Sequence, residues 1–221
     1  MNAIDAYKIA RATVRVLRDS NQTLEIFRVE ELTGRGRFLH LIEQLRGDPG
    51  MQRLLAERPE LGPETVDFDA LRRLPEGTLG REFIRHLDDN GLSLSPELTA
   101  TRFTEDPDVA YLFRRSRQTH DVTHALLGLG TSGHEEVLVH AFSFGQIGLP
   151  VSALIMFFGG IKHMVLEKRW NAVRRGLYHT YRSGRRAAPL LPVFWEERWS
   201  ESLDDLRRDL GIEIGSPADL H

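Results

Sequence analysis

The stretch that decides the fold is residues 106–127, which read DPDVAYLFRRSRQTHDVTHALL. Asp106-Pro107 is typical of a helix start, because aspartate caps free backbone N–H groups and proline tolerates the first helical position. From Val109, apolar residues recur at helical spacing without a breaker as far as Leu127. The pattern therefore predicts one helix that contains His120 and His124.

The residues that follow predict a turn and a second helix. Gly128, Gly130 and Gly133 supply the turn, and a new helix is expected from His134 to about Ile147. The chain should therefore double back, so that the second helix packs against the first.

Helical spacing recurs along most of the chain. The other expected helices are Ile4–Leu17, Arg37–Leu45, one starting at Asp48-Pro49, Gly77–Leu87, an apolar one from Pro150, and one capped by Ser200 or Ser202 that ends at Leu210. Alternating β-branched residues are nearly absent. We expect an all-α helical bundle, with the proline- and glycine-rich stretch 59–77 as packed loops inside a single domain, 1–221.

Composition narrows the function classes. The hydrophobic fraction of 41% is ordinary for a globular protein, and a net charge of −3 argues against nucleic-acid binding. The absence of cysteine excludes disulfides, thiolate nucleophiles and cysteine-ligated metals, so any metal must use His, Asp or Glu. No targeting segment is visible at the start, which favours a cytoplasmic location.

His120, Asp121 and His124 carry the chemistry. On a helix, His120 and His124 lie about 40° apart and one turn apart, so both imidazoles can reach one cation. Asp121 lies at about 100°, at the edge of the same arc. Val109 and Phe113 fall on the same face, and burying these polar groups is costly unless they are paired or bind a metal. The alternative to a metal site is that the two histidines form ordinary hydrogen bonds inside a helical core.

A further ligand should come from the second helix. Glu135 and Glu136 both lie in its first turn, and helical periodicity does not choose between them. Either glutamate could instead stabilise the helix N-terminus by its charge. His134 and His140 are weaker candidates by the same spacing argument.

The pattern His120-Asp121-x-x-His124, followed after eleven residues by Glu136, resembles the coenzyme Q biosynthesis protein 4 family. The further matches are Gly148-Leu149-Pro150, Trp195-Glu196-x-Arg198-Trp199 and Leu203-Asp204-Asp205-Leu206-Arg207, so the resemblance is clearest over residues 100–215. It selects Glu136 over Glu135. It implies that His120, Asp121, His124 and Glu136 are the metal ligands and the catalytic residues.

The resemblance also implies a function. The expected activity is metal-dependent removal of the C1 carboxyl from a polyprenylated 4-hydroxybenzoate in ubiquinone biosynthesis, by a carbon–carbon lyase. The alternative is a non-catalytic scaffold that holds polyprenyl lipids for the other ubiquinone biosynthesis proteins. Zinc is the expected ion, with Mg, Mn, Fe or Co as alternatives. We also consider a homodimer as the oligomeric state.

Residues 137–161 carry no charge. Because Gly148-Leu149-Pro150 interrupts them, two consecutive buried helices are favoured over a membrane span. Apolar side chains after the break could line a groove for a polyprenyl tail or could be ordinary core; the candidates are Leu149, Val151, Leu154, Ile155 and Phe158. The basic stretch 162–186 is either a solvated helix face or a surface for anionic lipid, which would place the protein peripherally on the inner face of a membrane.

A phosphohydrolase is the third interpretation, since adjacent His and Asp residues also occur in that superfamily. It requires an upstream histidine and a late aspartate as further ligands. His86 and Asp204 are available, but the sequence around His86 offers no matching context.

Overall fold

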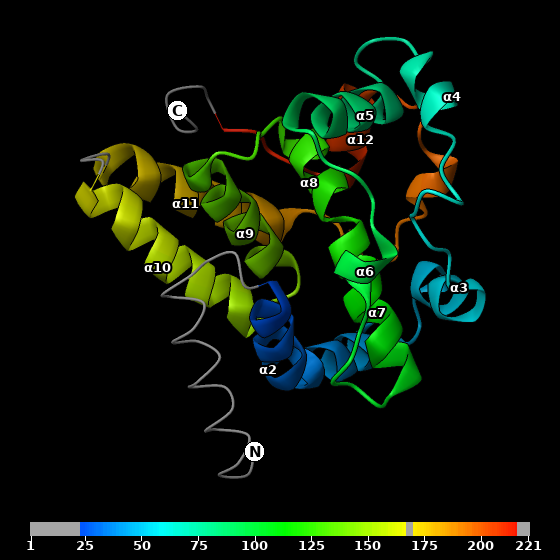
Figure 1. Ribbon diagram of the computed structural model, residues 1–221, viewed down its shortest axis with the longest axis horizontal. Helices are drawn as coiled ribbons and strands as arrows, with labels where there is room; N and C mark the ends of the chain where they lie inside the picture. The colour runs from blue at the N-terminus through cyan, green and yellow to red at the C-terminus, as the bar shows by residue number, and fades with distance from the viewer. Residues whose placement is uncertain (1–22, 167–169, 216–221) are drawn as a thin grey trace.

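The structure, a computed structural model, describes residues 23–166 and 170–215 of the 221-residue chain (Figure 1). The predicted all-α fold is confirmed: across these residues there are helices and a single isolated bridge between Thr78 and Ser202, but no strand. The expected helix Ile4–Leu17 lies outside the described residues.

The helices follow one another along the chain with short connections. They are α2 (Thr23–Gln44), α3 (Pro49–Glu57), α4 (Phe68–Arg72), α5 (Leu79–Asn90), α6 (Pro96–Thr99), α7 (Pro107–Gln118), α8 (His120–Leu127), α9 (Gly133–Gln146), α10 (Pro150–Leu166), α11 (Trp170–Arg186), the 3-10 helix η1 (Trp195–Glu197) and α12 (Leu203–Leu210).

The prediction of one unbroken helix over 109–127 is wrong. Thr119, with φ −91° and ψ 3°, ends α7 and precedes α8. Its hydroxyl donates to the Arg115 carbonyl (2.9 Å), a back-bond that bends helices. His120 therefore starts a new helix axis, so its predicted alignment with Val109 and Phe113 does not hold. His120 and His124 still lie one turn apart, both within α8.

The uncharged stretch 137–161 forms two consecutive helices, as predicted, but the second is not fully buried, because Phe157 and Phe158 are exposed. The chain leaves α9 at Ile147 and passes Gly148, whose φ of 75° favours glycine, before Pro150 starts α10. The Arg37 Nε donates to the Ile147 carbonyl (2.9 Å), which satisfies one group at the end of α9. Among the described residues, no helix is long and apolar enough to cross a membrane.

The core has two parts, and the candidate site lies where they meet. One joins α5, α8, α9 and α12 and contains Phe83, Phe142 and Trp195. The other joins α2, α3 and α7 with the start of α10. In Figure 1, α5, α8 and α12 gather at the top, α2 lies at the bottom, and α9, α10 and α11 lie side by side. The returning chain thus places α9 beside α8.

Candidate metal centre

His120 and His124 point their Nε2 atoms at each other, 3.2 Å apart. The Nδ1 of His124 lies 3.2 Å from the Leu129 carbonyl, which accepts its proton. This tautomer leaves the lone pair on Nε2, the arrangement that metal-binding histidines use. The His124 side chain is completely buried. The C-terminal turn of α8 therefore orients His124 toward a cation.

The two glutamates left open by periodicity have different roles. Glu135 belongs to a capping box: its carboxylate accepts from the backbone N–H groups of Gly130 (2.8 Å) and Ser132 (3.2 Å). Glu136 instead places one carboxylate oxygen 3.5 Å from His120 Nε2 and the other 3.5 Å from His124 Nε2. The structure therefore brings Glu136, and not Glu135, to the two histidines.

The spacing of these three side chains fits a tetrahedral ion. Zinc bonds of about 2.0–2.1 Å imply ligand atoms about 3.3–3.4 Å apart. The observed separations are 3.2, 3.5 and 3.5 Å. His120 and Glu136 remain 30% and 34% exposed, so the centre is reached from one side. Three ligands and an accessible fourth position are typical of catalytic metal sites.

Asp121 lies on another side of His124. It groups with His86 and His124, whose possible ligand atoms all lie within 4.8 Å of one another. The Asp121 Oδ1 is 3.8 Å from His86 Nε2. His124 belongs to both groups, so Asp121 and His86 adjoin the triad of His120, His124 and Glu136. The triad alone does not include Asp121.

His140 lies near the triad and His134 does not. The His140 ring is 5.4 Å from the His120 ring, and its Nδ1 is 3.3 Å from the Ser152 hydroxyl of α10. The His134 Nδ1 instead lies 3.0 Å from the Ser132 hydroxyl at the start of α9. His140 is therefore part of the site wall rather than a member of the triad.

The electrostatics of the triad favour a bound positive charge. Burial by itself would raise the pKa of Glu136, but hydrogen bonds and charge from His120 and His124 hold it well below its usual range. Burial would lower the pKa of His120, and the Glu136 carboxylate outweighs that and raises it. For His140, burial and then the charge of His120 lower the pKa to about 3. A cation bound between these side chains would therefore pair with the Glu136 carboxylate and compete with protons for the imidazole nitrogens.

A cavity of about 330 Å³ opens onto His120, Asp121 and His140. Its apolar wall includes Leu149, Val151 and Ile155, three of the five residues predicted to hold a lipid tail. The other two predicted residues do not line it. Phe158 lies two turns beyond Val151 on the same side of α10 and is 37% exposed, and Leu154 lies about 60° around the helix from Val151. The volume is within the range of small-molecule sites, about 300–1,000 Å³.

Two buried carboxylates beside the cavity were missed by sequence reasoning. Glu30 and Glu31 of α2 both pair with Arg117, at 2.7 and 2.9 Å. Burial raises the pKa of Glu30 despite the opposing charge of Arg117. Both Glu30 and Arg117 line the cavity. Glu30 is about 90 positions before the histidine pair, so only tertiary packing shows that it belongs to this wall.

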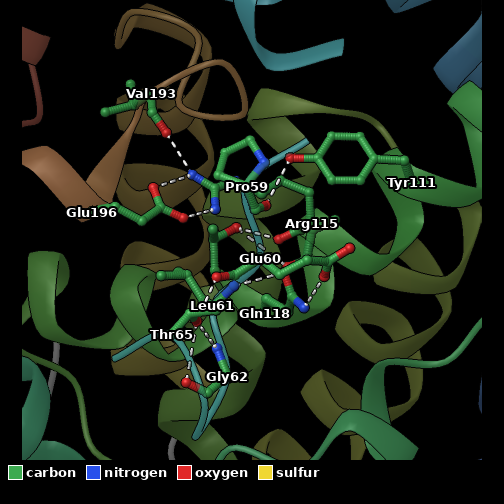
Figure 2. A network of polar contacts seen from close by, with 12 residues as sticks. Pro59, Glu60, Leu61, Gly62, Thr65, Tyr111, Arg115, Gln118, Val193 and Glu196 are labelled. Atoms are coloured by element: carbon green, nitrogen blue, oxygen red, sulfur yellow. Dashed lines mark hydrogen bonds and ion pairs between the residues drawn. The ribbon is translucent and has the colours of Figure 1, made fainter. Parts of the chain in front are cut away.

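A second polar network supports the floor of the cavity (Figure 2). The Arg115 side chain, completely buried, forms an ion pair with Glu196 (2.5 Å) and donates to the Val193 carbonyl (2.8 Å). The Gln118 side chain accepts from the Leu61 backbone N–H (3.2 Å). Gln118 and Leu61 line the cavity, so this network fixes the position of its floor.

Of the residues considered for a phosphohydrolase, the structure brings only His86 to the site. The Asp204 side chain is 84% exposed and pairs with Arg207 (3.1 Å). It therefore does not join His86, Asp121 and His124 as a ligand.

Comparison with known proteins identifies the family of the chain. Residues 5–215 match the family model described as "Coenzyme Q (ubiquinone) biosynthesis protein Coq4". The human ubiquinone biosynthesis protein COQ4 homolog, mitochondrial, is 40% identical over 82% of this chain and 68% of its own length. The Anopheles gambiae homolog is 33% identical over 94% of this chain and 73% of its own.

A crystal structure from Nostoc punctiforme, of a protein assigned provisionally to ubiquinone biosynthesis, has the same fold. Its TM-score is 0.74 at 25% identity, over 94% of this chain and 98% of that one. Both matches cover most of the chain, and the range 5–215 of the family model includes the positions of the triad. The chain belongs to the coenzyme Q (ubiquinone) biosynthesis protein Coq4 family, which acts in ubiquinone biosynthesis.

Proposed function

We propose that this protein removes the C1 carboxyl of a polyprenylated 4-hydroxybenzoate, with one divalent cation held by His120, His124 and Glu136 and with Asp121 beside it. The observation that carries the proposal is that His120 and Asp121 line a cavity beside the triad, and that Leu149, Val151 and Ile155 form an apolar part of its wall. The cavity thus matches a ligand with a carboxylated phenol head and a hydrocarbon tail.

The donor set fits zinc best, with Mg, Mn, Fe or Co as alternatives, because two imidazoles and a carboxylate suit all of these to different degrees. When bound, the cation would supply Lewis acidity toward the carboxylate or phenol oxygens of the ring. His124, held by the Leu129 carbonyl, orients the centre. His120 is the member of the triad that lines the cavity, so it would face a bound ring.

The apolar wall would hold the tail. Leu149, Val151 and Ile155 face the cavity at the start of α10, directly after the break that follows α9. Each buried methylene of a bound tail contributes about 0.8 kcal/mol, so the tail rather than the head would dominate affinity. Water excluded by the tail would also strengthen the electrostatic interactions at the head.

The test uses a prenylated 4-hydroxybenzoate labelled with ¹³C in the carboxyl group. Wild-type protein loaded with zinc should release ¹³CO₂ and leave a ring without the carboxyl, detected by mass spectrometry. The electron pair of the broken bond stays on C1 and takes up a proton. A product with hydroxyl at C1 would instead require an oxidant, and a redox-active metal would replace zinc in the proposal.

The non-catalytic scaffold remains the second candidate, because the same cavity would hold the lipid without reacting. Its outcome is also clear: the labelled lipid would co-purify unchanged with wild-type protein, and no ¹³CO₂ would appear with any of the metals. Glu136→Gln serves as the control in both cases, since it keeps the side-chain shape but removes the charge that faces both histidines.

A membrane surface is the natural source of such a lipid, and we propose that α10 and α11 contact it. Exposed basic side chains follow one face of α11; they are Arg174, Arg182 and Arg185. On the neighbouring α10, Phe157 is 60% exposed and packs edge-on against Phe158. Basic residues contribute about 1 kcal/mol each at an anionic surface, and exposed aromatic rings insert beside headgroups.

Vesicle flotation tests this surface. Wild-type protein should float with vesicles that contain anionic phospholipid and should stay in solution with neutral ones. Phe157→Ser combined with Arg182→Ser should weaken flotation several-fold, whereas Leu92→Ser, an exposed position directly after α5, should not. A peripheral position on the inner face of a membrane would follow from the first result.

A further inference from the structure

His124 is the most restrained ligand of the candidate centre. Its side chain is completely buried, whereas His120 and Glu136 are 30% and 34% exposed. The Leu129 carbonyl holds its Nδ1, and the His120 ring packs edge-on against it, with centroids 4.8 Å apart and planes at 80°. One face of the His124 ring is covered by a residue from a different helix, His86 of α5.

The two rings are stacked. Their centroids lie 4.7 Å apart and their planes differ by 25°. The His86 side chain is only 6% exposed, so the contact is inside the protein. Its Nε2 lies 3.8 Å from the Asp121 carboxylate, beyond hydrogen-bond distance, and finds no hydrogen-bond partner among the described residues. The face of the ring, rather than a hydrogen bond, is thus the contact that His86 makes with the centre.

The position of His86 on α5 explains why this contact is rigid. Neighbouring positions of α5 are filled by the buried side chains of Phe83, Ile84 and Leu87. These anchor α5 in the core that also contains α8. A flat ring held by such a helix restricts rotation of the His124 ring about its Cβ–Cγ bond. A ligand already fixed in its binding orientation loses less conformational entropy when it binds.

We propose that the His86 ring is a positioning group for the metal centre. By stacking on His124 it keeps the Nε2 of that residue directed at His120 and Glu136. His86 acts through His124 and does not itself need to contact the cation. The inference rests on the proposed cation site and names a residue that the His-Asp-x-x-His pattern does not contain.

Three substitutions separate the possible roles of His86. His86→Phe keeps a flat ring and removes both nitrogens. His86→Leu keeps an apolar side chain of similar size without a flat face, and His86→Ala removes the contact. Affinity for Zn²⁺ is measured by competition with a chelator, and the visible spectrum of the Co²⁺-loaded protein reports ligand geometry. Neither readout depends on catalysis.

We expect His86→Ala to bind Zn²⁺ about 10- to 100-fold more weakly, as for other residues that support metal ligands. His86→Leu should lose at least about fivefold, and the Co²⁺ spectrum of both should change. His86→Phe should stay within about twofold of wild type and keep its spectrum. Leu210→Ala, in the core but on α12, is the control: it should lower the melting temperature without changing Zn²⁺ affinity, because it leaves α5 and α8 intact.

The results decide between the alternatives. Equal affinities of wild type, His86→Leu and His86→Ala would overturn the positioning role. A His86→Phe protein as weak as His86→Ala would also overturn it, because the nitrogen and not the ring would then matter. If wild type itself bound no cation, the proposed metal centre would be wrong, and the positioning role of His86 would be overturned with it.

Discussion

Two buried polar clusters of this molecule, only a few turns of helix apart, differ in how their groups are paired. Around Arg115, charged donors meet charged acceptors: Nη1 and Nη2 bond to the Glu196 carboxylate, and Nη2 also bonds to the Val193 carbonyl (Figure 2). Around His124, atoms of the same kind converge. Two imidazole nitrogens and two carboxylate oxygens face one another at 3.2–3.5 Å.

The difference separates a structural network from a binding site. The charge of the Arg115 guanidinium is already balanced by a carboxylate, although its Nε has no hydrogen-bond partner among the described residues, so no further ion is required there. Converging lone pairs repel unless a proton or a cation lies between them. The two clusters should therefore respond differently to substitution: the first should change stability, and the second should change metal binding.

The largest effect is expected for His124→Ala. This change removes the buried, pre-oriented ligand, and Zn²⁺ affinity should fall at least about 1,000-fold, equivalent to about 4 kcal/mol. Bound metal in the purified protein should fall to near zero by elemental analysis. Retention of a full equivalent of metal would show that the triad is not the centre.

The next effect tests the paired network. Arg115→Met should lower the free energy of unfolding by about 3 kcal/mol, because the change leaves the Glu196 carboxylate without its buried partner. Metal content per folded molecule should not change. Urea denaturation provides the measurement.

The matched control for Arg115 is Arg53→Met. Arg53 also pairs with a glutamate of η1, Glu197, at 2.5 Å, but these two side chains are 44% and 55% exposed. Exposed pairs contribute about 0–1 kcal/mol, so this variant should be near wild type. Equal losses in the two variants would mean that burial does not distinguish the Arg115 network.

The apolar end of the cavity gives an intermediate effect. Wild type should bind prenylated 4-hydroxybenzoates more tightly as the tail lengthens, and Ile155→Arg should weaken the long-tailed ligand about 10- to 30-fold, or about 1.4–2 kcal/mol. Leu154→Arg, one residue earlier and outside the lining, is the control and should keep the dependence on tail length. The affinities are measured by calorimetric titration. If both variants lost the dependence of affinity on tail length equally, the cavity assignment would be wrong.

Much of the fold could be predicted from the sequence because its signals are local. Asp48 and Asp106 cap α3 and α7 as their Asp-Pro pairs predict. The break at Thr119 was missed because it depends on one hydroxyl bonding back to Arg115, which apolar periodicity does not register. Helix α2 was predicted only over its last part, since its earlier residues show no clear apolar face.

The same distinction applies to the site. His120, His124 and Glu136 lie within 17 positions, on two helices joined by one turn, so local geometry and the family resemblance were enough to name them. His86 and Glu30 lie far upstream, on helices whose docking depends on tertiary packing. The orientation of Asp121, toward His86 rather than into the triad, likewise required the packing of α5 on α8.

The smallest expected effect concerns the wall of the centre and its dependence on pH. Burial and then the positive charge of His120 lower the pKa of His140 to about 3 from an ordinary 6.5. The unfolded chain therefore binds a proton between about pH 6.5 and 3 that the folded protein does not. On this account, His140 stabilises the fold above pH 6.5, and its contribution is lost as the pH falls through that window.

His140→Phe should remove this dependence in metal-free protein. One such group gives a slope of up to about 1.4 kcal/mol per pH unit, and because one side of His140 faces the cavity we expect about half of that. His120, with its raised pKa, has the opposite sign and favours the fold at low pH, but it is present in both proteins and cancels in their difference. Urea unfolding with chelator at pH 7, 6 and 5 should therefore show the variant gaining stability relative to wild type as the pH falls. Parallel curves would mean that His140 is protonated as readily in the folded protein as in the unfolded chain, so that the wall beside the triad is open to water.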